Sequence, residues 1–304
     1  MGILAALDVS IGRGIEDRNE FATRLLQKQY QKCTSLLDRS IKDQTRSIEQ
    51  TKLTLKKRKG VVPFVRIFPA FVARVEAQLD GADKLPVRNV VNLSYERIVG
   101  TMFECLQQMA KMDGEGQGQA GEDKDQLNYH VILIENMHHI MAVFKGEKVG
   151  ALVGFVQQAR EKYTSNLDAY IKLILRRPLA RVLDFFLGLE QLLRTTPPTE
   201  VSLHSAYTRA ALKRTLGDLR AKDLRKAVDA LYKRVDKHFG ADVTNPSAGQ
   251  GDVLKTVWRA TEEEVQRLLS GWRDLIGRCY PDGGVGIEFG EREVHGMFGN
   301  AQVG

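Results

Sequence analysis

The strongest candidates for chemistry in this sequence are three side chains within about one helical turn, Glu135, His138 and His139. A carboxylate and an imidazole spaced three or four residues apart lie on the same helix face and can share a metal ion. A closed metal site needs further ligands, and no second cluster of acidic residues and histidines is evident in the sequence. We therefore predict that the three residues form a structural pair or pack helices together, and that they bind no metal.

A second candidate is the run Gly283-Gly284-Val285-Gly286, which is superficially similar to a phosphate-binding loop. It is expected to follow a helix rather than a strand, and no Lys-Ser or Lys-Thr pair follows it, so we predict no nucleotide site and no other cofactor. No serine, histidine and aspartate set lies in a recognisable nucleophile context. The sequence therefore favours a binding protein over an enzyme. The spacing of its two tryptophans is typical of a helical core rather than a stacking platform for nucleic-acid bases, and we expect no nucleic-acid partner.

Basic residues form the remaining candidate site. The chain has a formal net charge of +7, and two clusters contribute strongly to it, one at the end of the first long predicted helix and one within residues 206–240. From them we take a candidate patch for anionic lipid or an acidic partner: Lys56, Lys57, Arg58, Lys59, Arg220, Lys222, Arg225, Lys226, Lys233, Arg234 and Lys237. Four aspartates interleave with the second cluster, which favours a solvated helix face there. The first run also suits a helix C-terminus. Direct membrane binding by a basic helical module is the alternative function.

The elements that must position these residues are long amphipathic helices. Apolar residues return to one face of a 3.6-residue helix in segment after segment, for example at Leu152, Val156, Tyr163, Leu167 and Tyr170. The composition is 43% hydrophobic and 27% charged, which is typical of a globular protein and not of a disordered one. We predict an all-α fold.

Glycines and prolines divide the predicted helices into groups. We expect a flexible N-terminus over residues 1–16, a first helical bundle over 17–112, a Gly-rich acidic loop over 113–125, C-terminal helical bundles over 126–282 with a mobile loop at 240–252, and a tail over 283–304. The three cysteines are far apart and form no CxxC pair, which fits a reducing cytosol. The sequence shows neither a signal peptide nor an apolar stretch of membrane-spanning length.

Several stretches, taken in order, point to one family. They are the segments 48–52, 56–60 and 63–64, then 129–132 and 135–139, then Lys162-Tyr163, Leu167, Tyr170 and Pro178-Leu179, then 231–238, Trp258, and 278–281. In this order and spacing, over roughly residues 17–289, they resemble the C-terminal region of the exocyst complex component one family. No single stretch is a catalytic signature; the ordered set carries the resemblance.

The resemblance implies an elongated rod of stacked antiparallel helical bundles, of the kind shared by multisubunit tethering complexes. It implies a cytoplasmic scaffold that is peripheral at sites of exocytosis on the plasma membrane, binds other exocyst subunits and helps to dock secretory vesicles. Intact members of the family also carry an N-terminal phosphoinositide-binding domain, which meets Rho-family GTPases, and a coiled-coil region. Neither fits ahead of Asp17, so we expect this chain to be a fragment, a truncated product or a shortened homologue.

Overall fold

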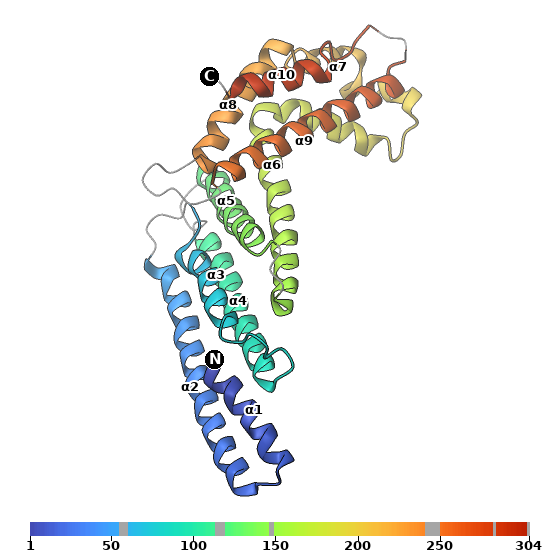
Figure 1. The fold of residues 1–304 in the computed structure, drawn as a ribbon. Helices are drawn as coiled ribbons and strands as arrows, with labels where there is room; N and C mark the ends of the chain where they lie inside the picture. Colours follow the sequence, from blue (N-terminus) through green and yellow to red (C-terminus); the bar gives the residue numbers. More distant parts are fainter. Residues whose placement is uncertain (55–59, 113–118, 146–148, 241–249, 282–283, 303–304) are drawn as a thin grey trace. The chain divides into compact units, whose positions relative to one another are not determined.

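A computed structural model describes residues 1–54, 60–112, 119–145, 149–240, 250–281 and 284–302 of the chain (Figure 1). Within these ranges all the regular secondary structure is helical, and no residue there belongs to a strand. The prediction of an all-α fold is confirmed.

The chain divides into two compact units, residues 1–166 and 167–304. This division differs from the bundles that we expected over residues 17–112 and 126–282. Unit 1 contains α1 (Gly2–Glu16), α2 (Glu20–Thr54), α3 (Pro63–Glu76), α4 (Pro86–Met112), α5 (Gln119–Val143) and the first part of α6 (Gly150–Leu192). Unit 2 contains the rest of α6, two short 3-10 helices η1 (Pro198–Leu203) and η2 (Ser205–Tyr207), and α7 (Arg209–Leu216), α8 (Ala221–Phe239), α9 (Gln250–Cys279) and α10 (Glu291–Ala301).

Residues 1–16 form α1, although we expected a flexible N-terminus. Helix α1 packs against α2 as a hairpin and also contacts α4 (Figure 1). Leu4 is buried, and the Asp8 carboxylate accepts a hydrogen bond of 2.7 Å from the backbone N–H of Val87 in the first turn of α4. That N–H has no partner inside its own helix, so the contact holds α1 on the fold.

The core of unit 1 is built on the apolar faces of α3, α4 and α5. Helix α4 contacts both α2 and α5, and α3 packs on α5. Proline opens α3 and α4 at the first helical position, where its missing N–H removes no helical hydrogen bond. Gly60 and Gly81, which precede these helices, have positive φ angles of 91° and 73°, a conformation that glycine adopts readily. These residues fix where each helix begins.

Unit 2 is closed by α10, which lies within residues 283–304, the segment that we expected to be a loose tail. Val294 and Phe298 of α10 are fully buried. The Trp258 ring of α9 packs at a tilt against Phe298, with ring centroids 4.6 Å apart, and its indole N–H donates a hydrogen bond of 3.1 Å to the Phe298 carbonyl. A buried indole with its N–H satisfied is a stable anchor, so the end of the chain is part of the core.

The loops also differ in part from the prediction. Residues 113–118 of the first expected loop and 241–249 of the second lie outside the described ranges. Helix α5 begins at Gln119, within the first expected loop, and α9 begins at Gln250, within the second. Helix α6 continues through Pro178, although proline disfavours a helix interior. Proline removes one helical hydrogen bond, but Leu175 and Leu179 on either side are both buried, and their packing continues across the interruption.

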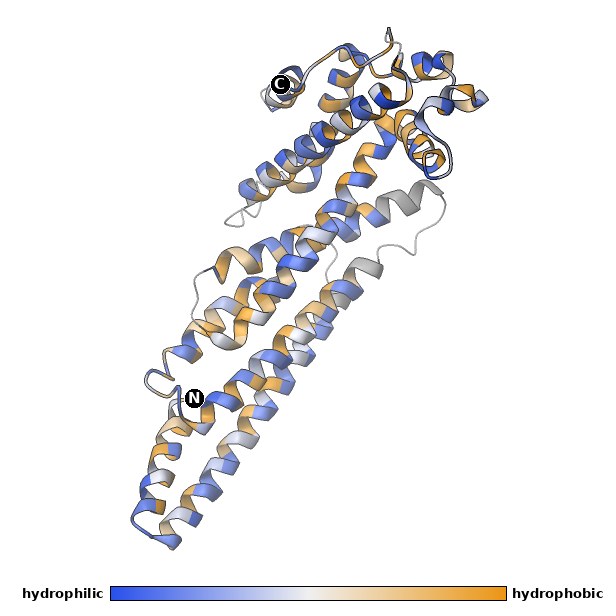
Figure 2. Cartoon of the chain, turned by 90° about the vertical axis from the view of Figure 1, so that its right-hand side faces the viewer, coloured by the Kyte–Doolittle hydropathy of each residue, from blue (hydrophilic) through white to orange (hydrophobic). Residues whose placement is uncertain are grey.

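Hydrophobic and hydrophilic residues alternate along the helices in Figure 2, as expected when each helix buries one face. Among the residues that the structure describes, no helix combines the length and the apolar character needed to cross a membrane.

Candidate partner-binding surfaces

Glu135 and the adjacent Asn136 hold the start of α3 against α5. The Glu135 carboxylate accepts a hydrogen bond of 2.7 Å from the backbone N–H of Gly60. The Asn136 side chain accepts one of 2.9 Å from the N–H of Val62, the residue that precedes α3, and donates one of 2.8 Å to the carbonyl of Ile132. Both side chains are buried. The buried carboxylate is therefore already bound to the backbone of its own chain.

The two histidines of the cluster pack against other side chains. The His138 ring lies beside Tyr163, with centroids 5.9 Å apart. Burial lowers the pKa of His139, and the positive charges of His138 and Arg66 lower it further. Over the described ranges no group of three or more histidine, cysteine, aspartate or glutamate residues is placed to hold a metal ion. The geometry gives this cluster a role in joining α3, α5 and α6.

Helix α8 presents most of the predicted basic patch. Its buried face consists of Leu224, Val228, Leu231, Val235 and Phe239. The predicted bases lie on the remaining surface: Arg220, Lys222, Arg225, Lys226, Lys233 and Lys237 are exposed and Arg234 is half-buried. The interleaved acids Asp223, Asp229 and Asp236 are exposed among them, and Asp218 binds Arg181 at 2.6 Å. The arrangement is a basic helix face diluted by carboxylates.

The other part of the predicted patch, Lys56, Lys57, Arg58 and Lys59, lies outside the described residues. The structure therefore does not show whether these bases meet those of α8. A combined patch stays a prediction.

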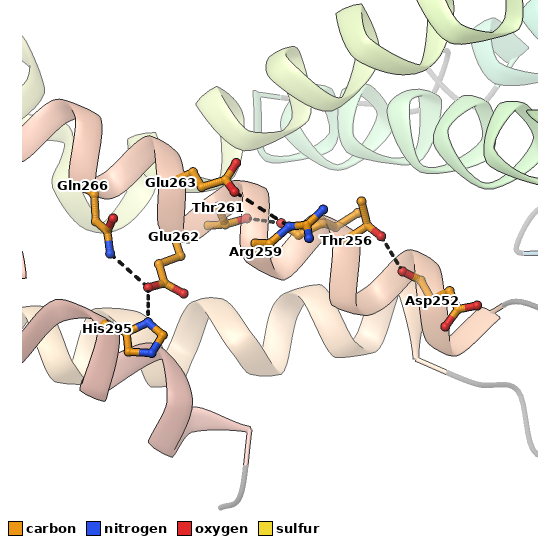
Figure 3. Close-up of polar contacts among 9 residues, drawn as sticks. Asp252, Thr256, Arg259, Thr261, Glu262, Glu263, Gln266 and His295 are labelled. Atoms are coloured by element: carbon orange, nitrogen blue, oxygen red, sulfur yellow. Dashed lines mark hydrogen bonds and ion pairs between the residues drawn. The ribbon is translucent and has the colours of Figure 1, made fainter. Parts of the chain in front are cut away.

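Polar contacts also connect α9 and α10 on the surface of unit 2 (Figure 3). The Glu262 carboxylate meets His295 Nδ1 of α10 at 2.7 Å and accepts a hydrogen bond of 3.0 Å from Gln266. Arg259 and Glu263 form an exposed ion pair at 3.7 Å along the same helix. The contact between Glu262 and His295 joins α10 to α9, and the other two contacts lie along α9 itself.

Two grooves were not predicted from the sequence. One, of about 400 Å³, lies in unit 1 between α2, α3 and α4. The other, of about 410 Å³, lies in unit 2 between α6 and α9, where Phe186 stacks on Trp272 at a centroid distance of 4.9 Å. The sequence contained a signal for the groove in unit 1. Helix α3 has apolar residues on two faces, whereas a helix that packs on one side needs only one apolar face.

Comparison with known proteins identifies the family. The model of the family described as "Exocyst complex component Sec3, C-terminal" matches residues 1–282. The chain belongs to this family. The match includes α1, which our sequence comparison did not reach, and ends before α10.

Individual relatives of the Sec3 C-terminal family agree with this assignment. The chain is similar to exocyst complex component 1 of Mus musculus, with 28% identity over 258 residues, which is 84% of this chain and 26% of the mouse protein. It is also similar to exocyst complex component 1 of Drosophila melanogaster, with 25% identity over 86% of this chain and 27% of the relative. The chain thus spans about a quarter of the length of these relatives. No solved structure matches it.

Proposed function

We propose that this chain is a helical scaffold that binds other exocyst subunits and thereby helps to dock secretory vesicles at the plasma membrane. The observation that carries the proposal is the family match over residues 1–282. The relatives are components of the exocyst complex by name, and a component of a complex must offer surfaces to its neighbours.

The structure supports a binding role. Each unit has a buried apolar core, and polar contacts such as Asn136 to Val62 and Trp258 to Phe298 fix one helix on another. Each fully buried leucine, valine or phenylalanine side chain contributes about 1.5–3 kcal/mol, so such cores keep exposed faces in a fixed geometry. Fixed faces lose little conformational entropy when a partner binds.

The test is an affinity purification with the 304-residue chain as bait in cytosol of the organism from which it comes, followed by mass spectrometry. An unrelated helical protein of similar charge is the control. We expect enrichment of exocyst subunits on this chain only. Failure to enrich any of them with bait shown to be folded by circular dichroism would contradict the proposal.

The alternative function, direct binding of anionic phospholipid, rests on the exposed bases of α8. The aspartates among them weaken attraction to a negatively charged surface. We therefore rank it below assembly with other subunits.

A further inference from the structure

Helix α3 has a second apolar face that the described part of the chain leaves partly open. One face, with Val65, Phe68, Val72 and Val75, is buried in unit 1. On the adjacent face Phe64, Ile67 and Phe71 recur at i, i+3 and i+7: Phe64 and Phe71 are half-buried and Ile67 is 62% exposed. A single exposed isoleucine would need no explanation, but a stripe along a whole helix does.

This open face is one wall of the unit 1 groove. The other wall is formed by α2 through Gln44, Ser47, Ile48 and Thr51, and Ile98 and Met102 of α4 line the groove between them. The α3 wall, residues 63–74, is about 16 Å long at 1.5 Å per residue. An apolar groove of about three helical turns has the length and character of the sites that bind amphipathic helices.

The charge of the groove indicates what the bound helix carries. Among the described residues that line it, Arg74 is the one charged residue and none is a carboxylate. Its exposed guanidinium has no ion-pair or hydrogen-bond partner among the described residues. The polar residues of the α2 wall are neutral. A partner helix with a carboxylate beside its apolar stripe would complement this lining.

We propose that this groove binds an amphipathic helix of another exocyst subunit, which packs apolar side chains against Phe64, Ile67 and Phe71 and places a carboxylate against Arg74. That the partner is an exocyst subunit rests on the proposed function; the groove and its charge do not. A phosphate-bearing lipid headgroup fits less well, because the described part of the lining supplies one cation.

The first experiment locates the partner segment. A photo-reactive benzoyl-phenylalanine replaces Ile67 in the full chain, the chain is mixed with the other exocyst subunits produced recombinantly, and cross-linked peptides are read by mass spectrometry. We expect cross-links to one helical segment of another subunit that has an apolar stripe and an aspartate or glutamate beside it. Cross-links only to a second copy of this chain, to lipid or to a segment without that pattern would overturn the proposal.

The second experiment measures affinity for the cross-linked subunit. Ile67→Asp is compared with Val153→Asp, which makes a similar change at a position that is also 62% exposed, on α6 and away from the groove. We expect the dissociation constant to rise by about tenfold or more for Ile67→Asp and by less than about twofold for the control. Arg74→Glu should also weaken binding, and reversing the partner's carboxylate to lysine should restore it.

The outcomes separate this proposal from the proposed function. If the wild-type chain binds exocyst subunits and Ile67→Asp binds them equally well, the groove assignment is wrong and the scaffold role stands. If the folded wild-type chain binds none of them, both are wrong. Far-ultraviolet circular dichroism and thermal unfolding of each variant show whether a loss of binding arises from misfolding.

Discussion

Replacing Asn136 by leucine should destabilise unit 1, because it removes the partner of a buried backbone N–H. The Asn136 side chain is fully buried and accepts the hydrogen bond of Val62 at 2.9 Å. Leucine has a similar size, so little cavity forms, but the Val62 N–H is left without a partner. A buried unsatisfied donor costs about 1–3 kcal/mol. The amide of Asn136 also donates to the Ile132 carbonyl at 2.8 Å and to the Gly60 carbonyl at 3.4 Å. The first carbonyl lies one turn earlier in the same helix and the second contact is long, so both matter less than the bond from Val62.

The matched control is Asn166→Leu on α6, which makes the same chemical change with the same gain in helix propensity. Asn166 is also buried, but its amide donates to the Lys162 carbonyl one turn earlier, and its oxygen lies 2.8 Å from Nδ1 of the half-buried His130. Water can replace that contact, so we expect a loss below about 1 kcal/mol.

Urea unfolding followed by far-ultraviolet circular dichroism gives both free energies of unfolding, and hydrogen exchange at Val62 reports the local opening. We expect the Val62 amide to exchange faster in Asn136→Leu than in the control. Equal stability of the two variants would refute the reasoning, since the propensity gain is common to both and only Asn136→Leu leaves the buried Val62 N–H without its partner. The start of α3 would then be held by other contacts.

Four further predictions follow from the same structure. Trp272→Ala should lower the free energy of unfolding by about 3–5 kcal/mol, because the indole is 4% exposed; a loss below about 1 kcal/mol in a denaturant titration would place it at the surface. Changing His138 and His139 together to glutamine should leave subunit binding intact if circular dichroism shows that the variant is folded, and elemental analysis should find no stoichiometric zinc in the wild-type chain. The Arg88 guanidinium lowers the pKa of Glu76, so the pair should stabilise the fold at neutral pH and lose that contribution as pH falls below the ordinary glutamate range; Arg88→Met should reduce this acid sensitivity. Phosphoinositide-containing vesicles should co-sediment the chain weakly at low salt and not at physiological salt, because each exposed base adds only about 1 kcal/mol within a Debye length of about 8–10 Å; headgroup-selective, salt-resistant binding would contradict this.

The helices themselves could be predicted from the sequence because their signals are local. Periodic apolar residues such as Leu152, Val156 and Tyr163 indicated a long amphipathic helix, and α6 is present there. The ends of the chain could not be predicted in the same way. Helix α1 has only Leu4 buried, and α10 is only eleven residues long. Each is stabilised by a distant partner, α1 through Val87 and α10 through Trp258, and sequence periodicity does not reveal such contacts.

The candidate surfaces were predicted less completely than the fold. The sequence of α8 predicted that its bases and the acids among them share the exposed surface, because helical spacing alone determines which residues lie on one helix face. A structural role was predicted for Glu135, but its partner was not, since Gly60 lies 75 residues away along the chain. The groove depends on the relation of α2, α3 and α4, which the sequence does not specify residue by residue. The one indication of the groove in the sequence was that α3 has apolar residues on two faces.

The contacts at the two ends of α3 explain how an open apolar face can be kept rigid. At its start, Asn136 fixes Val62 at 2.9 Å. At its end, the Glu76 carboxylate receives two hydrogen bonds from Arg88, of 2.7 and 2.8 Å, and one of 2.7 Å from the Tyr95 hydroxyl. A helix held at both ends by charged or buried partners cannot rotate its second face inward to hide it. The open face of α3 is therefore preorganised. When a partner helix binds there, this chain loses little conformational entropy, so more of the contact energy contributes to affinity.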